Sequence, residues 1–222
     1  MTVTEEGKVT TMREFNLLCK YPQPPERIIP NRTIEDRILA AYRGVDFFDG
    51  PRSSGYGGMK YDGIAWAATA EFIMEIYDKP KRVIQFGCEK GFLLTELFLR
   101  GVEVVGIDSS SYARTHALKE VKILPGLPTD QLANPFDLAL ALGLVYTSNL
   151  GDAMSCIRMV ERVAHKAFIT LMSAETENEE RLLRKWTLLG TTILSKADWI
   201  EVVKHCGYTG DYWFITIDHL RP

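Results

Sequence analysis

A glycine-bearing turn, followed by a carboxylate 21 residues after its first glycine, is the feature of this chain best suited to binding a ligand. Gly87 and Gly91 follow the apolar run 83–86, and a second apolar run begins at Phe92. A turn of this kind between a strand and a helix lets the backbone approach a ligand closely, and the helix N-terminus offers free N–H groups. Asp108, at the end of the next expected strand, can accept hydrogen bonds from both ribose hydroxyls of a nucleoside. The spacing therefore predicts a nucleoside-containing cofactor. In the simpler alternative the glycines only make a tight turn and Asp108 caps a helix.

The turn lacks the glycine spacing of a dinucleotide site. That site requires G-x-G-x-x-G, whereas Glu89 occupies the middle glycine position here and its carboxylate would oppose a pyrophosphate. The segment 83–91, VIQFGCEKG, instead resembles motif I of the class I S-adenosylmethionine-dependent methyltransferases, whose usual form is (V/L)D(V/L)GCGxG. The resemblance extends over residues 60–219. It implies a Rossmann-like α/β fold, S-adenosylmethionine as cofactor and S-adenosylhomocysteine as product.

Two further blocks resemble one bacterial group of that superfamily. Residues 47–63, FFDGPRSSGYGGMKYDG, resemble its GYGGYxYDGRW block, and residues 206–214, CGYTGDYWF, resemble its GYTGDY block. Members of this group are often encoded beside functions of sugar or polysaccharide synthesis. The resemblance therefore implies a small-molecule acceptor, with a sugar or polysaccharide precursor methylated at oxygen as the favoured reaction.

The resemblance also implies which residues form the site. Cofactor contacts are expected from the turn, the end of the second strand, the glycine-rich loop and the end of the fourth strand: Gly87, Cys88, Gly91, Asp108, Ser109, Tyr56, Gly57 and Gly143. The expected catalytic residues are Asp62, Tyr61 and Tyr146, and the expected substrate contacts are Arg52, Tyr56 and Tyr146. Arg52 could equally pair with Asp46 or Asp49, and the tyrosines could be packing residues. Methyl transfer mainly requires alignment in a dry site, with a base only where the acceptor must lose a proton.

Three residues depart from the family pattern and support a second hypothesis. Gln85 stands where an acidic residue is usual, Glu89 replaces a glycine, and Ile64 replaces an arginine. A methyltransferase-like chain that has lost turnover and serves as a binding or scaffold module would tolerate all three changes. A third hypothesis, an NAD-dependent oxidoreductase, is opposed by the missing glycine.

The elements that must position these residues alternate along the chain. Strands are expected at 82–86, 102–107, 121–124, 136–142, 167–172 and 212–218, and helices at 65–77, 92–99, 111–119, 151–163, 175–186 and from Ser195 to about 205. This alternation predicts a doubly wound, mostly parallel sheet of the seven-stranded type, with its site at the carboxyl ends of the strands. Residues 61–222 should form this domain. Residues 1–60 should form an N-terminal helical and loop cap, with Asn31 at the start of a helix.

Composition excludes several classes of protein. The chain has 222 residues, 46% of them hydrophobic and 25% charged, which is ordinary for a soluble domain with a large core. Its net charge of −3 gives no basic surplus, so nucleic acid is not expected as a partner. Neither the cysteines nor the histidines have the spacing of a metal motif, and no apolar run is long enough to span a membrane. We therefore expect a cytoplasmic protein without a metal, whose oligomeric state stays open, with a homodimer as one option.

Overall fold

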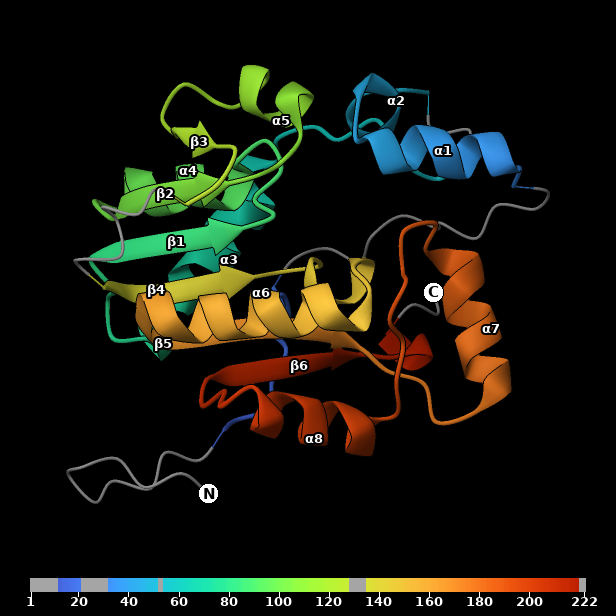
Figure 1. Cartoon of the computed structure of the whole chain (residues 1–222). Helices are drawn as coiled ribbons and strands as arrows, with labels where there is room; N and C mark the ends of the chain where they lie inside the picture. Colours follow the sequence, from blue (N-terminus) through green and yellow to red (C-terminus); the bar gives the residue numbers. More distant parts are fainter. Residues whose placement is uncertain (1–11, 21–31, 52–53, 128–134, 220–222) are drawn as a thin grey trace.

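Six parallel strands form one sheet in the computed structural model, which describes residues 12–20, 32–51, 54–127 and 135–219 (Figure 1). The strand order is β3-β2-β1-β4-β5-β6. The strands are β1 (Arg82–Phe86), β2 (Glu103–Ile107), β3 (Ile123–Leu124), β4 (Phe136–Ala141), β5 (Ala164–Met172) and β6 (Asp211–Ile215). The predicted fold class is confirmed. The described part of the chain has six strands where seven were expected, because β6 pairs directly with β5 and no strand lies between them.

The register places the ends of the central strands level with one another. Phe86 of β1 pairs with Ile107 of β2 on one side and with Ala141 of β4 on the other. The strand order also reverses at β1, since β2 and β4 leave it in opposite directions. The loops that follow these three strands therefore start at one edge of the sheet, at the switch point where ligands bind in open α/β folds.

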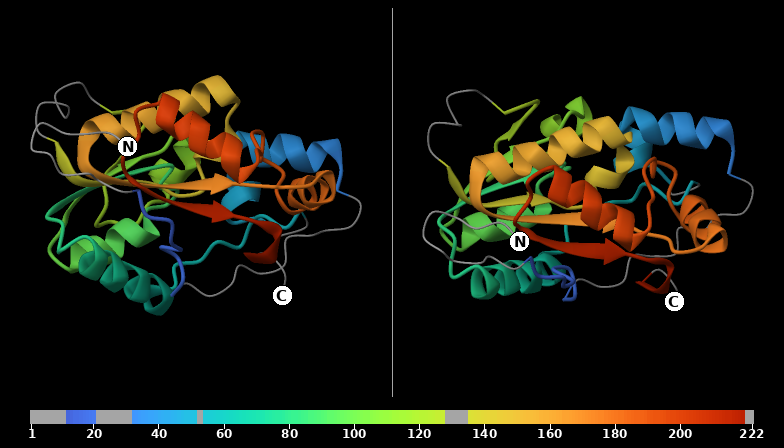
Figure 2. Two further views of the ribbon diagram at one scale, coloured as in Figure 1. Left: turned by 90° about the horizontal axis from the view of Figure 1, so that it is seen from below. Right: turned by 60° about the horizontal axis from the view of Figure 1, so that its bottom comes forward.

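Helices cover both faces of the sheet, as Figure 2 shows. One face carries α6 (Leu150–Val163) and α8 (Lys196–His205), and the other carries α3 (Gly63–Ile76) and α4 (Phe92–Leu99). Because both faces are covered, the strands are apolar along their length rather than alternating. Phe136, Leu138, Ala139 and Leu140, for example, are all fully buried.

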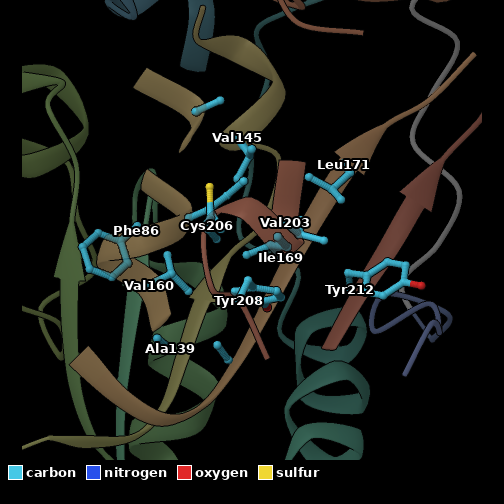
Figure 3. Packing of buried hydrophobic residues seen from close by; sticks show 14 of the residues in the cluster. Phe86, Ala139, Val145, Val160, Ile169, Leu171, Val203, Cys206, Tyr208 and Tyr212 are labelled. Carbon is cyan, nitrogen blue, oxygen red and sulfur yellow. The ribbon is translucent and has the colours of Figure 1, made fainter. Parts of the chain in front are cut away.

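The core beneath α6 and α8 is drawn in Figure 3. Val160 of α6 and Val203 of α8 pack there against Ile169 of β5. Trp199 of α8 is fully buried, and its indole N–H donates to the carbonyl oxygen of Met172 at 2.8 Å. This core holds β4, β5 and β6 in place and thereby fixes the loops at their carboxyl ends.

Residues 12–20 lie along the outer edge of the sheet. Glu14 forms a parallel bridge with Tyr212 of β6. Asp211 accepts hydrogen bonds from Arg13 Nε at 3.0 Å and from the Tyr77 hydroxyl at 3.0 Å, so the acidic residue of the GYTGDY block anchors this segment. The remaining described N-terminal residues form a separate cap over the carboxyl ends of the strands.

The cap consists of α1 (Ile34–Tyr42), α2 (Val45–Phe48) and the loop that leads to α3 (Figure 1). Thr33 begins α1 through a reciprocal capping box with Asp36, so the prediction that Asn31 caps this helix is wrong. Arg32 donates to the carbonyl oxygen of Trp186 at 3.1 Å and thereby ties the cap to the end of α7 (Glu177–Trp186). In the described part of the chain, no helix combines the length and the apolar character needed to cross a membrane.

Candidate active site

A cavity of about 610 Å³ opens at the carboxyl ends of the strands, below the cap. Its lining runs from the turn after β1, past the end of β4, to the end of β6. Of the predicted site residues, the structure brings six into this lining: Tyr56, Asp62, Gly87, Cys88, Gly143 and Tyr146. Cavities of this volume are typical of sites for small molecules and cofactors.

The turn after β1 is built on left-handed backbone conformations. Gly87 has φ +66° and Gly91 has φ +79°, which L-residues rarely adopt. Gly91 is the N-cap of α4 and lies outside the cavity lining. Glu89 also has a positive φ, +53°, although it carries a side chain. The fold therefore imposes a left-handed backbone conformation on a glutamate.

The backbone N–H groups of this turn donate hydrogen bonds to β2 and to Asp108. The N–H groups of Gly87 and Cys88 donate to the Ile107 carbonyl oxygen at 2.8 and 3.2 Å. Asp108 accepts from the N–H of Glu89 at 2.9 Å and from the N–H of Ser110 at 2.9 Å, one on each oxygen.

The expected role of Asp108 and Ser109 in binding a ribose stays a prediction. Asp108 is 2% exposed, and both residues lie outside the cavity lining. In this conformation Asp108 is a positioning residue, because it holds the turn whose backbone faces the cavity. The spacing of the sequence predicted that Asp108 follows the second strand. It did not predict that its two oxygens accept hydrogen bonds from the N–H groups of Glu89 and Ser110.

Gln85 is a polar side chain at the floor of the cavity. It lies in β1, is 7% exposed, and lines the cavity beside Gly87. Its Oε1 is buried and has no hydrogen-bond partner among the residues that the structure describes. A buried acceptor without a donor costs about 1–3 kcal/mol, so a ligand that donates a hydrogen bond here would be stabilised.

The glycine-rich loop is built on positive φ angles, as glycines at 55, 57 and 58 predicted. Their φ values are +86°, +101° and +62°. A Cβ on Gly57 would lie 2.5 Å from the carbonyl oxygen of Gly50, so this position, which lies outside the cavity lining, requires glycine.

Tyr56 is buried, stacks on Phe47 with ring centroids 4.9 Å apart, and forms a 3.3 Å hydroxyl contact with Thr187. Arg52, the predicted substrate contact, lies outside the described residues.

Lys90 joins the loop to the turn. Its side chain is 9% exposed, and its Nζ donates to Asp49 Oδ1 at 2.6 Å and to the Met59 carbonyl oxygen at 2.7 Å. Asp49 also accepts from the Tyr112 hydroxyl at 3.0 Å. Burial acts to raise the pKa of Asp49, but the hydrogen bonds from Lys90 and Tyr112 outweigh it and lower this pKa. Lys90 therefore holds the glycine-rich loop against the turn after β1.

The two adjacent candidates Tyr61 and Asp62 separate in the structure. The Tyr61 hydroxyl donates to Glu96 of α4, and Tyr61 lies outside the cavity lining. Burial, together with the hydrogen bond and charge of Glu96, raises the pKa of Tyr61 to about 12. This residue anchors the loop to α4, and its catalytic role stays a prediction. Asp62 does line the cavity, and its Oδ1 caps α3 by accepting from Ile64 and Ala65 N–H, both at 3.1 Å.

The end of β4 contributes a second polar group to the cavity floor. Gly143 has φ +71°, and its N–H donates to Thr170 Oγ1 at 2.7 Å. Thr170 is 1% exposed and lines the cavity, so its hydroxyl is a polar group on the cavity wall. Tyr146 lies in the short helix η2 (Val145–Thr147), is 7% exposed and lines the cavity as predicted.

Residues from the far end of the chain complete the cavity, and the sequence did not single them out. The lining includes Trp213 and Ile215 of β6, His219 after this strand, and Trp186 at the end of α7. The N–H of Thr216 donates to His219 Nδ1 at 3.2 Å, so the neutral ring carries its hydrogen on Nε2. Burial lowers the pKa of His219, which favours this neutral form as a hydrogen-bond donor. The aromatic run 212–214 could have indicated this part of the lining, because β6 pairs with β5 and ends at the same edge of the sheet.

The arrangement of the sheet and its helices has counterparts among solved structures. The N-terminal domain of EvdMO1 with SAH bound aligns with a TM-score of 0.50 and 16% identity, over 78% of this chain and 86% of that chain. The chain has the fold of the class I methyltransferases. The plantazolicin methyltransferase BpumL in complex with SAH aligns with a TM-score of 0.50 and 14% identity, over 78% of this chain and 77% of that chain. No family model and no curated protein matches the sequence.

The described residues offer no group of three or more histidine, cysteine or acidic side chains placed to hold a metal ion. Cys88 lines the cavity, but burial and the charges of Asp108 and Glu89 raise the pKa of its thiol, which keeps it protonated. Besides hydrogen bonding and aromatic packing, the cavity offers the ionisable side chains of Arg43, Asp62 and His219.

Proposed function

We propose that this protein is an S-adenosylmethionine-dependent methyltransferase that acts on a small molecule, and that it belongs to the bacterial group with the GYGGYxYDGRW and GYTGDY blocks. The preferred reaction is methylation at oxygen of a sugar or polysaccharide precursor. The observation that carries the proposal is the buried Oε1 of Gln85, which lines the cavity at the switch point of a methyltransferase fold. An ammonium group is a donor that would satisfy this acceptor.

The residues of the cavity fit the cofactor. S-adenosylmethionine, when bound, supplies an electrophilic methyl group. Gln85 would accept from its ammonium group, and the backbone at Gly87 and Cys88 would lie against its amino-acid part. Asp108 would hold that backbone in place, because it fixes the N–H of Glu89. The loop around Tyr56, held by Lys90, would exclude water from the reacting centre.

The acceptor would lie where β6 and the end of α7 line the cavity. Trp186 and Trp213 provide apolar walls there, and faces of sugars pack well on aromatic rings. Tyr146 would orient the acceptor hydroxyl. Asp62 keeps Oδ2 available, since only its Oδ1 bonds to the start of α3, and it is our candidate for removing the hydroxyl proton.

A second candidate function, a binding module without turnover, is favoured by one observation. Both oxygens of Asp108 already accept backbone N–H groups, and the side chain lies outside the cavity lining. A ribose could reach this buried carboxylate only after the residues around it had moved.

Two experiments separate these functions. Calorimetric titration with S-adenosylmethionine, S-adenosylhomocysteine and NAD tests the cofactor class, and we expect heat from the first two alone. Incubation with methyl-labelled cofactor and a panel of sugars and sugar nucleotides then tests turnover. Binding without transfer to any acceptor supports the module. Binding of NAD alone contradicts both candidates.

A further inference from the structure

Arg43 is a cation in the cavity wall that the proposed function leaves unused. It is the C-cap of α1, with φ 47° and ψ 44°, a left-handed conformation. Its carbonyl oxygen accepts from the Ser110 hydroxyl at 2.6 Å, and its N–H donates to the Ala40 carbonyl oxygen at 3.1 Å. The backbone of Arg43 is thus fixed at the point where the cap meets the loop after β2.

The side chain extends from this point toward the end of β4. The guanidinium carbon lies 5.7 Å from the centroid of the Phe47 ring, and one terminal nitrogen donates to Thr147 Oγ1 at 3.3 Å. Arg43, Phe47 and Thr147 all line the cavity. The guanidinium therefore bridges the cap and η2 above the region where a ligand would lie.

No carboxylate among the described residues forms an ion pair with Arg43. Other arginines of the chain do form such pairs: Arg13 with Asp211, Arg100 with Glu96 and Arg184 with Glu180. A guanidinium has five N–H donors, and the one hydrogen bond that this side chain forms with described residues goes to a neutral hydroxyl at 3.3 Å. Donors therefore remain for a ligand.

We propose that Arg43 binds a carboxylate or phosphate group of a ligand in this cavity. A guanidinium fork matches the paired oxygens of either group, and such charge-assisted hydrogen bonds are about twice as strong as neutral ones. This inference rests on the proposed function, because that function identifies the ligands of the cavity. Two of their groups could supply the anion. One source is the carboxylate of the cofactor's amino-acid part, and the other is an anionic group on the methyl acceptor.

The test compares wild type with Arg43→Gln, Arg43→Lys and the control Arg181→Gln by calorimetry. Arg181 is exposed on α7 and outside the cavity lining, so its substitution removes the same charge from a different surface. Glutamine and lysine at position 43 retain the backbone bonds to Ser110 and Ala40. Each variant is titrated with inorganic pyrophosphate, with S-adenosylhomocysteine and with its decarboxylated analogue. Pyrophosphate is also titrated into protein saturated with S-adenosylhomocysteine.

Loss of a charge-assisted fork should weaken binding of the relevant anion about 10- to 100-fold in Arg43→Gln. The lysine variant should lose less, and the control should match wild type. Weaker binding of S-adenosylhomocysteine, with the decarboxylated analogue unchanged, identifies the cofactor carboxylate. Weaker binding of pyrophosphate to the saturated protein identifies the acceptor.

Failure of this inference is distinguishable from failure of the proposed function. If S-adenosylhomocysteine binds to no variant but pyrophosphate binds to wild type and not to Arg43→Gln, the anion site stands and the proposed cofactor is wrong. If every ligand that binds wild type binds Arg43→Gln equally well, or if pyrophosphate and S-adenosylhomocysteine both fail to bind wild type, the assignment of Arg43 is overturned.

Discussion

Replacing Glu89 by glycine should stabilise the protein, because the turn after β1 holds this residue at φ +53°. An L-residue in the left-handed region costs about 1–2 kcal/mol, which glycine avoids. Glycine loses more backbone freedom on folding, at a cost of about 0.5–1 kcal/mol. The net gain is therefore about 0.5–1 kcal/mol, which corresponds to a rise in Tm of roughly 1–4 °C for a chain of this size.

Glu89→Ala is the matched control, since it removes the carboxylate and keeps the left-handed strain. Differential scanning calorimetry should show Glu89→Gly above both wild type and Glu89→Ala in Tm. The two variants should instead behave alike in binding S-adenosylhomocysteine. Each removes a charge from the cavity lining, and the affinity should stay within about tenfold of wild type.

Two results would refute this reasoning. A Glu89→Gly protein less stable than Glu89→Ala would show that the side chain, not the backbone conformation, decides the stability of the turn. Binding of the cofactor by Glu89→Gly where wild type shows none would mean that this carboxylate blocks the cavity. That second result would favour the binding module over the enzyme.

Other predictions concern the loop and the turn. Lys90→Met should lower stability by about 1–2 kcal/mol and speed hydrogen exchange in residues 54–60, because the loop loses its link to the turn; unchanged exchange would contradict the role of this lysine. Because the pKa of Asp49 is lowered in the folded protein, its ionised carboxylate stabilises the fold at pH values above the carboxyl's usual pKa. This stabilisation is lost as the pH falls from the usual pKa through the lowered one. The Tm difference between wild type and Asp49→Asn should therefore shrink from about pH 6 to about pH 3. Gly57→Ala should destabilise more than Gly101→Ala, since both have positive φ but only the first meets a backbone oxygen at 2.5 Å; equal Tm losses would refute the clash. Asp108→Ala should weaken S-adenosylhomocysteine binding and stability together, by about 1–3 kcal/mol, and an unchanged affinity would show that the turn needs no such support.

The sheet and its site edge could be predicted from the sequence because local patterns determine them. Short apolar runs separated by helix-length segments predicted β1, β2 and β4 within one residue of their bounds. The glycines at 55, 57 and 58 predicted positive φ angles within the glycine-rich loop, and all three have them, since only backbone geometry is involved. Chain order in an α/β fold then places the ends of these strands at one edge.

Side-chain contacts across the chain could not be predicted in this way. Tyr61 reaches Glu96, and Lys90 reaches Asp49, 41 residues away, through packing that no periodicity records. Arg43 enters the cavity only because its left-handed backbone turns the chain between α1 and α2. His219 was set aside for want of a metal spacing, yet the end of β6 carries it to the cavity.

The most direct test of the proposed function is the affinity for S-adenosylhomocysteine, measured by calorimetry in wild type, Gln85→Leu and Gln85→Glu. Wild type should bind one molecule per chain. Gln85→Leu should bind about tenfold or more weakly, because it lacks the acceptor for the ammonium group, while Gln85→Glu should bind at least as tightly as wild type. No binding to wild type, or equal affinity in wild type and Gln85→Leu, would contradict the assignment of this cavity to the cofactor.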